Sequence, residues 1–289
     1  MDAPETRELA YFVAVAEELH FGRAAERLGM AQPPLSRAIQ RLERRMGVAL
    51  LERTSRAVSL TPAGAVFLAE SRKALDAVAA AVRRAQRSGR ESPRLLVVMK
   101  PEGDAGLLGR ILPAYRLDPD AVEVEVVVCG IGEQSAMLRD GRADLAFLHG
   151  PWDDVSGFDV EPLLTEDQVA VLPRGHRLAD RAALVLSDLD GEQLPRWPGV
   201  DVAGASGPLV RDASQLMQLI ALSQVVAVLP ETMRRNARAD VVCVPVLDAP
   251  SSSILVAWPE RTRSRAVAAF VRACTEVAHG GRAVENAGR

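Results

Sequence analysis

The stretch of this chain that most restricts its fold lies between residues 21 and 64, where two helical patterns flank a glycine. Apolar residues recur at spacings of three and four from Phe21 onward. Gly29 ends this pattern, because glycine adopts the left-handed cap conformation without a side-chain clash. Pro33 and Pro34 then open a second helix, since a residue in the first turn needs no N–H. Two helices joined by a tight glycine turn predict a helix-turn-helix.

The second helix has a buried apolar stripe and a polar, basic outer face. Gly47 is expected to end it, and Val48–Leu60 has the pattern of two short strands around Arg53–Ser55, a basic hairpin or wing. Eight arginines and three acidic residues lie between residues 21 and 64. An ordinary solvated face explains the arginines alone equally well, but the helix-turn-helix and the wing together favour nucleic-acid binding. The outer face comprises Ser36, Arg37, Gln40, Arg41 and Arg44.

Charge divides the chain into a basic front and an acidic rear. Residues 1–90 hold 15 lysines and arginines against 10 acidic residues, whereas residues 91–289 hold 20 against 28. This asymmetry predicts one anion-binding module attached to a part that does not bind nucleic acid. The three cysteines form no CxxC pair and suit a reducing compartment. With no signal pattern at the amino terminus and no apolar run long enough for a bilayer, we expect a cytoplasmic protein.

From Pro62 to about Arg87 the pattern is one long alanine-rich helix, which no glycine interrupts after Gly64. Four apolar residues in it are spaced by seven, three and four, a short coiled-coil seam. Either this helix packs on its own domain or it pairs with a second copy. We favour dimerisation, because a lone helix-turn-helix contacts too little DNA to be selective. A polar hinge, Ser88–Pro93, follows. The seam residues are Leu68, Leu75, Val78 and Val82.

From Arg94 onward, strand and helix patterns alternate, which is typical of a doubly wound parallel sheet. A second α/β unit follows the first, and a closing helix ends the pattern. The predicted strands are Leu95–Met99, Val122–Cys129, Ala143–Leu148, Val160–Leu164, Gln168–Leu172, Val225–Leu229, Val241–Val246 and Ile254–Trp258. The predicted helices are Ala105–Arg116, Glu133–Arg139, Ser214–Leu222, Glu231–Arg238 and Arg263–Val277.

The residues up to Gly64 also carry a family resemblance. The ordered set AA..L...QP.LS..I..LE...G..L..R......LT.AG is long and specific. It resembles the amino-terminal DNA-binding segment of LysR-type transcriptional regulators, and the likeness extends over most of the chain. One departure is Leu51, where the family usually has phenylalanine, a change of volume in the packing of the wing. The resemblance implies a dimerising linker helix and a two-lobed effector domain with the architecture of periplasmic binding proteins.

The resemblance also implies how the protein would act. A homodimer or homotetramer would place its recognition helices in successive major grooves of an inverted repeat, and the wing would hold phosphates or enter the minor groove. A small-molecule effector between the two lobes would change the arrangement of the dimers. DNA bending or access for RNA polymerase, a candidate partner, would then change. The expected DNA contacts are Gln32, Pro33, Pro34, Ser36, Arg37, Gln40, Arg41, Arg53 and Arg56.

The rear domain shows no pattern typical of catalysis. The four histidines are scattered, with no HExxH and no Cys/His spacing suited to a metal, and there is no GxSxG. Gly130–Gly132 lacks the third glycine of a dinucleotide fingerprint and predicts a tight turn. We therefore expect no enzyme, metal or cofactor. A solute-binding protein would need an export signal and no helix-turn-helix, and an enzyme fused to a DNA-binding module would need a catalytic constellation.

Binding is expected at the carboxyl ends of the strands, where open α/β sheets hold their ligands. Lys100 is one of two lysines beside 33 arginines, and its ammonium could hold the carboxylate or phosphate of an anionic effector. Alternatively, Lys100 pairs with Glu102 or Asp104. Trp197 could stack on a ligand or be a core or rim residue, and Cys129 is a weaker candidate for a redox sensor. The candidate effector residues are Lys100, Asp104, Gly130, His149, Arg196 and Trp197.

The predicted fold class is α/β, with a winged helix-turn-helix and a linker helix in front of a two-lobed effector domain. The DNA-binding domain is expected over residues 1–60 and the linker helix over residues 61–89. The effector domain is expected over residues 93–289, with lobe I at about 93–163 and 263–289 and lobe II at about 164–262.

Overall fold

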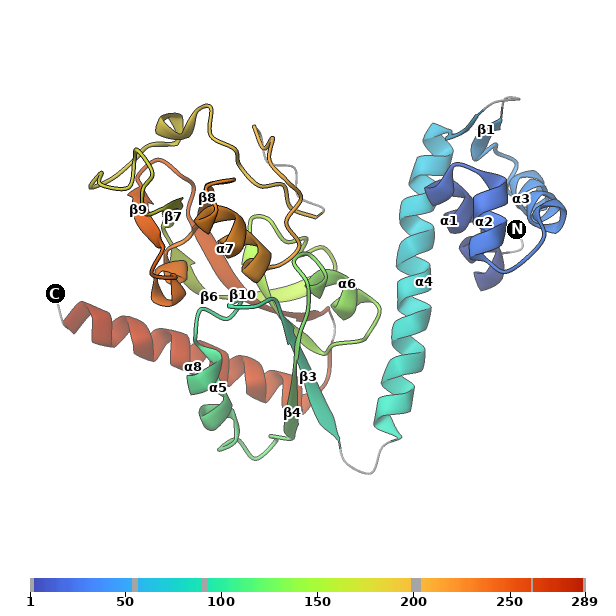
Figure 1. Ribbon diagram of the computed structural model, residues 1–289. Helices are drawn as coiled ribbons and strands as arrows, with labels where there is room; N and C mark the ends of the chain where they lie inside the picture. Colours follow the sequence, from blue (N-terminus) through green and yellow to red (C-terminus); the bar gives the residue numbers. More distant parts are fainter. Residues whose placement is uncertain (1–2, 54–56, 90–92, 199–203, 261, 288–289) are drawn as a thin grey trace. The chain divides into compact units, whose positions relative to one another are not determined.

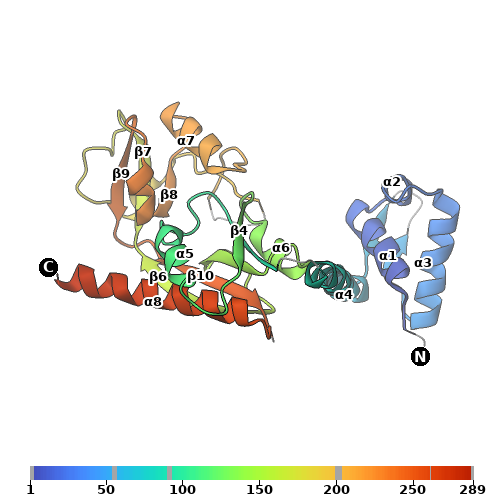
Figure 2. The ribbon, with the colours of Figure 1, turned by 90° about the horizontal axis from the view of Figure 1, so that it is seen from below.

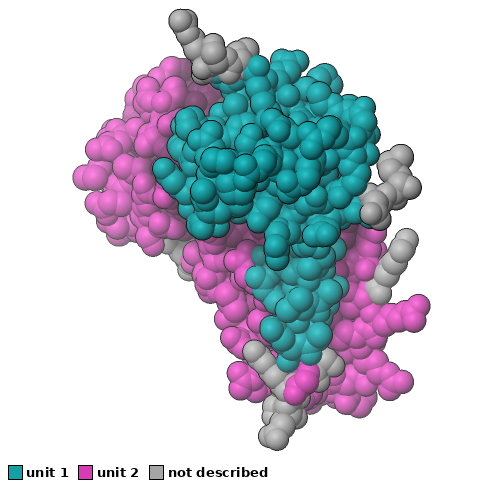
Figure 3. Space-filling view, turned by 90° about the vertical axis from the view of Figure 1, so that its right-hand side faces the viewer, with its two compact units in different colours: residues 1–86, 139–141 teal, residues 87–138, 142–289 magenta. Residues whose placement is uncertain are grey.

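The computed structural model describes residues 3–53, 57–89, 93–198, 204–260 and 262–287. The chain forms two compact units, residues 1–86 with 139–141 and residues 87–138 with 142–289, which are coloured separately in Figure 3. Figures 1 and 2 show the helices and strands of each unit in two views. Within the described ranges, no helix is long and apolar enough to cross a lipid bilayer.

The first unit is a helical domain with a two-stranded wing. Its core contains Phe12, Leu35 and Leu50, and the ring of Phe12 lies 5.0 Å from that of Phe67 in the long helix. The two wing strands pair antiparallel. The predicted helix-turn-helix, wing strands and long helix are all present. Its elements are α1 (Thr6–Glu18), α2 (Phe21–Arg27), α3 (Gln32–Met46), β1 (Leu51–Arg53), β2 (Val58–Leu60) and α4 (Pro62–Ser88).

The joint between the wing and α4 explains why this part of the sequence ends in a threonine and a glycine. The hydroxyl of Thr61 accepts the backbone N–H of Gly64 at 2.9 Å, and so supports the first turn of α4. At Gly64 the backbone passes so close to the wing that an added Cβ would lie 1.9 Å from the carbonyl oxygen of Leu50. Only glycine fits there without moving the backbone.

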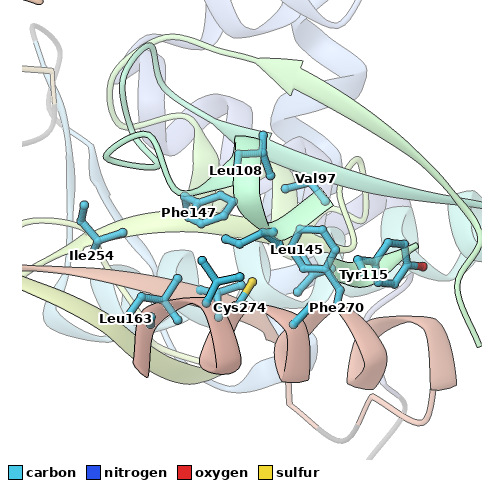
Figure 4. Packing of buried hydrophobic residues seen from close by; sticks show 14 of the residues in the cluster. Val97, Leu108, Tyr115, Leu145, Phe147, Leu163, Ile254, Phe270 and Cys274 are labelled. Carbon is cyan, nitrogen blue, oxygen red and sulfur yellow. The ribbon is translucent and has the colours of Figure 1, made fainter. Parts of the chain in front are cut away.

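The first lobe of the second unit is a five-stranded mixed sheet in the order β4-β3-β5-β10-β6. β3 runs parallel to β4 and β5, whereas β10 runs antiparallel to β5 and β6. α5 and α8 cover one face, where the rings of Tyr115 and Phe270 lie 5.3 Å apart (Figure 4), and α6 packs on the other. The elements are β3 (Arg94–Met99), α5 (Leu108–Tyr115), β4 (Glu123–Val128), α6 (Gln134–Arg139), β5 (Leu145–Gly150), β6 (Phe158–Glu166), β10 (Ser252–Pro259) and α8 (Arg265–Ala287).

The second lobe is a three-stranded antiparallel sheet in the order β8-β7-β9. α7 packs on one face through Leu216 and Ile220, and the segment that contains η1 packs on the other through Leu184 and Leu189. The chain crosses between the lobes twice, from β6 to β7 and from β9 to β10. The elements are β7 (Gln168–Pro173), η1 (Leu186–Leu189), α7 (Ala213–Ala221), β8 (Ala227–Pro230), η2 (Glu231–Asn236) and β9 (Val241–Val246).

The structure corrects the sheet arrangement expected from sequence. Only β3, β4 and β5 form a parallel set, and the second sheet is antiparallel throughout. β10 belongs to the first sheet and not to lobe II at about 164–262, where we expected it. Hydrophobic runs reveal buried strands, but they carry neither strand direction nor the choice of sheet. α5 begins later than predicted because Ala105 and Gly106 adopt positive φ, and α8 continues ten residues past Val277.

Candidate functional site

The turn between α2 and α3 is built by local caps. Nδ1 of His20 accepts the backbone N–H groups of Gly22 at 3.0 Å and Arg23 at 3.2 Å, so this side chain caps α2. Gly29 has a φ of +64°, the left-handed conformation that glycine adopts without strain. α3 then begins at Gln32, with two prolines in its first turn. The histidine cap was missed from sequence, where its position directly before a helix was the available signal.

The outer face of α3 presents most of the residues expected to contact DNA. Arg37, Arg41 and Arg44 are exposed along one stripe, because residues three and four apart share a helix face. In the part of the chain that the structure describes, none of these three side chains makes a hydrogen bond or an ion pair. They are therefore available to a ligand. Of the other expected contacts on α3, Gln32, Pro33 and Gln40 are exposed, and Pro34 and Ser36 are half-buried.

Other arginines of this unit are engaged by acidic partners. The carboxylate of Glu17 in α1 lies 2.7 Å from Nη1 of Arg27 in α2 and accepts Nη2 of Arg72 in α4 at 2.7 Å. Burial acts to raise the pKa of Glu17, but the hydrogen bonds from Arg72 and Arg27 lower it below its ordinary value. Glu17 thus ties three helices together. Further pairs of this unit include Arg23–Glu18 and Arg45–Glu8.

Glu43 joins α3 to the wing. Its Oε1 accepts the backbone N–H groups of Leu50 at 3.0 Å and Leu51 at 3.1 Å, and its Oε2 accepts Nη2 of Arg53 at 2.9 Å. These bonds satisfy the N–H groups at the start of β1, which a half-buried backbone requires. From sequence, Glu43 was counted only as one of three acids, and this contact across the fold had no local signal.

Arg53 was expected to contact DNA phosphates, but the structure engages it within the protein. Besides its ion pair with Glu43, its guanidinium lies 4.7 Å from the centre of the Phe21 ring, a cation–π contact. Only 27% of the Arg53 side chain is exposed. Arg56, the other wing arginine expected to contact DNA, lies outside the described residues.

In the second unit, several expected effector residues gather at the carboxyl ends of the parallel strands. Lys100 directly follows β3, Cys129 directly follows β4, and His149 lies near the end of β5. The backbone N–H of Cys129 donates to the carbonyl of Met99 at 2.9 Å, and Asp153 accepts the backbone N–H of His149 at 2.7 Å. These bonds hold the three strand ends and the loop after β5 in one cluster.

The polar side chains in and near this cluster are half-buried or buried, and some of them lack hydrogen-bond partners among the described residues. Burial lowers the pKa of the Lys100 ammonium, and the nearby Asp153 opposes the shift. Burial, together with the charge of Lys100, lowers the pKa of His149 to about 3, so the imidazole is neutral at neutral pH. Among the described residues, Nδ1 of His149 and both amide atoms of Gln134 find no hydrogen-bond partner. Buried polar groups without partners usually mark a place for ordered water or a ligand.

Two other candidates of the first lobe hold their own loops together. Asp104 is buried and accepts the backbone N–H of Leu108 at 2.9 Å, so it supports the first turn of α5. The carboxylate that acts on Lys100 is that of Asp153, and Asp104 contributes nothing comparable. The backbone N–H of Gly130 donates to Glu133 at 2.9 Å within the tight turn that the sequence predicted.

The candidates of the second lobe lie in the segment before α7. Nε of Arg196 donates to the carbonyl of Gly207 at 2.9 Å and closes a loop, while Trp197 is half-buried against the core of that lobe. The next residue approaches the first lobe, because a Cβ on Gly132 would lie 3.2 Å from the carbonyl oxygen of Pro198. The structure therefore brings Pro198 close to the turn after β4.

The cysteines show no sign of activation. Burial raises the pKa of Cys129 to about 11, with Glu133 and Asp153 acting in the same direction. Burial also raises the pKa of Cys243 and Cys274. All three thiols are unpaired and protonated at neutral pH, and a protonated thiol is a poor nucleophile. The nearby Arg142 acts to lower the pKa of Cys129, but burial and the two acids outweigh it.

The comparison with known families decides what these two units are. Residues 6–65 match the family described as bacterial regulatory helix-turn-helix protein, lysR family, and residues 88–279 match the LysR substrate binding domain. This chain belongs to the LysR family. It is a transcriptional regulator with a DNA-binding helix-turn-helix and an effector-binding domain, in a family of regulators and not of enzymes.

Similar regulators span nearly the whole chain. The Hca operon transcriptional activator HcaR of Escherichia coli is 32% identical over 285 residues, which cover 92% of this chain and 96% of HcaR. AlsR of Bacillus subtilis is 35% identical over 232 residues, 75% of this chain and 76% of AlsR. The solved structure of full-length BenM is 26% identical with a TM-score of 0.52, and the match covers 96% of this chain and 98% of BenM. The oxidized form of Corynebacterium glutamicum OxyR is 25% identical with a TM-score of 0.53, over 99% and 96% of the two chains.

Proposed function

We propose that this LysR-family regulator reads DNA through the outer face of α3 and binds a small anionic effector at the strand ends of its second unit. The observation that carries the DNA-reading role is the stripe of three exposed arginines on α3, which make no hydrogen bond or ion pair among the described residues, whereas most other described arginines of this unit are paired. The proposed contacts on α3 are Gln32, Pro33, Pro34, Ser36, Arg37, Gln40 and Arg41. Arg56 is proposed to hold a phosphate or enter the minor groove from the wing.

Dimerisation through α4 is the second part of the proposal. Leu68 packs in its own domain, but Val78 and Val82 are 46% and 52% exposed on the outer turns of the same helix. A second α4 would cover them and would place two recognition helices on an inverted repeat, as a dimer or tetramer. The proposal includes action in the cytoplasm, where DNA and RNA polymerase, a candidate partner, are found.

The effector is proposed to be a small anion with hydrogen-bonding groups. Lys100 supplies a half-buried positive charge, and His149 and Gln134 supply donors and acceptors that lack partners within the described residues. An anion there would accept hydrogen bonds directly from the ammonium, which favours ligands with a carboxylate or phosphate. Gly130 and Asp104 shape the surrounding loops, and Arg196 and Trp197 are proposed to contribute from the second lobe. Closure of the lobes around the effector would change the arrangement of the dimers.

The DNA-reading role is tested with a duplex selected from random-sequence DNA by the wild-type protein. Arg37→Ala is expected to weaken binding to that duplex by about 5- to 150-fold, which corresponds to about 1–3 kcal/mol, because a bidentate base contact is lost. Binding to mixed-sequence DNA is expected to change much less. Arg84→Ala, on the exposed surface of α4, is the matched control. Equal losses on both DNAs would show that Arg37 reads no base.

The effector role is tested by thermal shift with a panel of small carboxylates and inorganic phosphate. A member that raises the Tm of the wild-type protein is expected to have no effect on Lys100→Met, while DNA binding without effector is retained. Loss of DNA binding together with the thermal shift would mean that Lys100 is structural. If no anion shifts the Tm and uncharged metabolites do, the proposed effector class is wrong.

A further inference from the structure

The wing arginine Arg53 is held by two different groups of the protein. Nη2 donates to Glu43 at 2.9 Å on one side, and the guanidinium lies over the Phe21 ring at 4.7 Å on the other. By contrast, Arg37 and Arg44 on α3 have no such partners within the described ranges. Two kinds of arginine therefore occur in the same small unit: some make no hydrogen bond or ion pair among the described residues, and others, Arg53 among them, are held by acidic partners.

Glu43 can restrain Arg53 because its carboxylate is itself fixed. Oε1 accepts two backbone N–H groups, those of Leu50 and Leu51, which leaves Oε2 aimed at the guanidinium. Only 16% of the Glu43 side chain is exposed. An ion pair between one fixed, largely buried partner and a planar guanidinium loses less entropy than a pair of mobile surface chains.

We propose that Glu43 is a positioning residue that keeps Arg53 off the DNA backbone and thereby limits non-specific affinity. This inference rests on the proposed reading of DNA by α3 and the wing. A guanidinium paired with a carboxylate displaces few counterions from a phosphate chain, whereas a released one adds a contact of equal strength on every sequence. Holding Arg53 back leaves sequence readers such as Arg37 with a larger share of the binding free energy, and so raises selectivity.

The substitution Glu43→Gln separates the two tasks of the carboxylate. The amide oxygen of glutamine can still accept the N–H groups of Leu50 and Leu51. Its NH₂ group then faces the guanidinium, and two donors cannot bond each other. Arg53 is thereby released while the start of β1 keeps its hydrogen bonds. Glu52→Gln is the charge-matched control, because Glu52 is exposed in the same strand beside Arg53.

The experiment measures binding of the full chain to a mixed-sequence duplex and to the selected duplex between 50 and 200 mM salt. Glu43→Gln is expected to bind the mixed-sequence duplex more tightly at low salt, with a slope of log K against log salt that is steeper by about 0.9. Over this salt range its affinity falls by an additional factor of roughly 3 to 4. Arg53→Ala is expected to leave the wild-type slope unchanged, and the double variant Glu43→Gln/Arg53→Ala is expected to lose the gain. The ratio of selected to mixed-sequence affinity falls in Glu43→Gln alone.

Two results would overturn the inference. A slope for Arg53→Ala that is shallower than wild type by about 0.9 would mean that Arg53 already contacts a phosphate. A gain in Glu43→Gln no larger than in Glu52→Gln would mean that only net charge matters. If Glu43→Gln unfolds at the assay temperature, the salt dependence of Arg53→Ala alone still tests whether Arg53 contacts a phosphate in the wild type. If wild type shows no preference between the selected and mixed-sequence duplexes, the proposed DNA reading fails first, which distinguishes the two failures.

Discussion

The two units of this regulator treat their polar side chains in opposite ways. In the first, acids such as Glu17 and Glu43 are surrounded by arginine partners and backbone N–H groups, and the arginines left over point to solvent. In the second, Lys100 is half-buried and His149 is buried at the strand ends, and Nδ1 of the imidazole has no hydrogen-bond partner among the described residues. In the first unit the largely buried acids have their partners without a ligand, whereas in the second the imidazole at the strand ends does not, within the described residues.

The difference fits the two tasks. A reader of DNA must present its contacts in a fixed frame, since a helix in a groove tolerates little displacement. A sensor must gain free energy when its ligand arrives, and buried groups without partners are a store of such free energy, because the ligand relieves their desolvation cost. Ion pairs that are complete within the protein therefore suit the DNA-binding unit, and buried polar groups without partners suit the effector-binding unit.

Substitution of Gly64 is expected to destabilise the first unit more than any other change considered below. In Gly64→Ala the new Cβ would meet the carbonyl oxygen of Leu50 at 1.9 Å, and backbone has to move to relieve it. We expect a loss of about 3 kcal/mol or more in the free energy of unfolding, measured by urea titration with circular dichroism. Gly109→Ala in α5, where a Cβ meets open space, is expected to be neutral or to stabilise by up to about 1 kcal/mol. Similar effects at both glycines would contradict the close approach.

The incomplete site of the second unit should become more stable when its charge is removed. Lys100→Met keeps roughly the side-chain volume and removes a half-buried ammonium, whose pKa burial lowers although the nearby Asp153 opposes the shift. We expect the free energy of unfolding to rise by about 1–3 kcal/mol. Lys73→Met is the control, since Lys73 is exposed and pairs with Glu70 at 2.8 Å, and we expect a change below about 0.5 kcal/mol. Destabilisation by Lys100→Met would mean that the ammonium has a partner that stabilises it.

Tryptophan fluorescence reports the unfolding of the second unit alone, because all three tryptophans of the chain lie in that unit. They are Trp152, Trp197 and Trp258.

Acid should weaken the second unit through His149. The pKa of His149 is about 3 in the folded state, below the ordinary value of 6.5. Between about pH 6.5 and pH 3 the unfolded chain therefore binds a proton that the folded chain does not. The contribution of the neutral imidazole to the free energy of unfolding is complete above about pH 6.5. It falls by up to about 1.4 kcal/mol per pH unit below that pH. His149→Gln is expected to flatten the dependence between pH 7 and pH 5, followed by urea titration and tryptophan fluorescence, whereas His279→Gln, at an exposed position, leaves it unchanged. An unaltered slope in His149→Gln would assign the acid sensitivity to other groups.

The smallest expected effect sharpens the picture of the first unit. Glu17→Gln removes the charge that pairs with Arg27 and Arg72, and we expect a loss of about 1 kcal/mol or less, because both arginines are half-exposed. Since the folded pKa of Glu17 is lowered, its contribution is present above about pH 4.5 and is lost as the pH falls further. Differential scanning calorimetry at pH 7 and pH 4 measures both, with the exposed Glu26→Gln as control. A larger loss at pH 4 than at pH 7 would reverse this assignment.

The sequence by itself determined the order of the elements and the nature of the first unit. Gly29, Gly47 and the prolines of α3 act on their own neighbours, so helix limits could be predicted from local spacing and caps. The same local pattern carried the family resemblance. It also located the strand ends where Lys100 and His149 lie, because each βα turn is visible in the chain.

Tertiary structure decided what depends on segments that are distant in sequence. The direction of β7, the place of β10 beside β5, the pairing of Arg53 with Glu43 and the burial of Lys100 each require two or more elements to meet. Composition counts an arginine as a charge wherever it lies. Only the folded chain decides whether an arginine pairs with an acid of the protein or stays available to DNA. The reason is that Coulomb energy and desolvation depend on distance in space and not on distance along the chain.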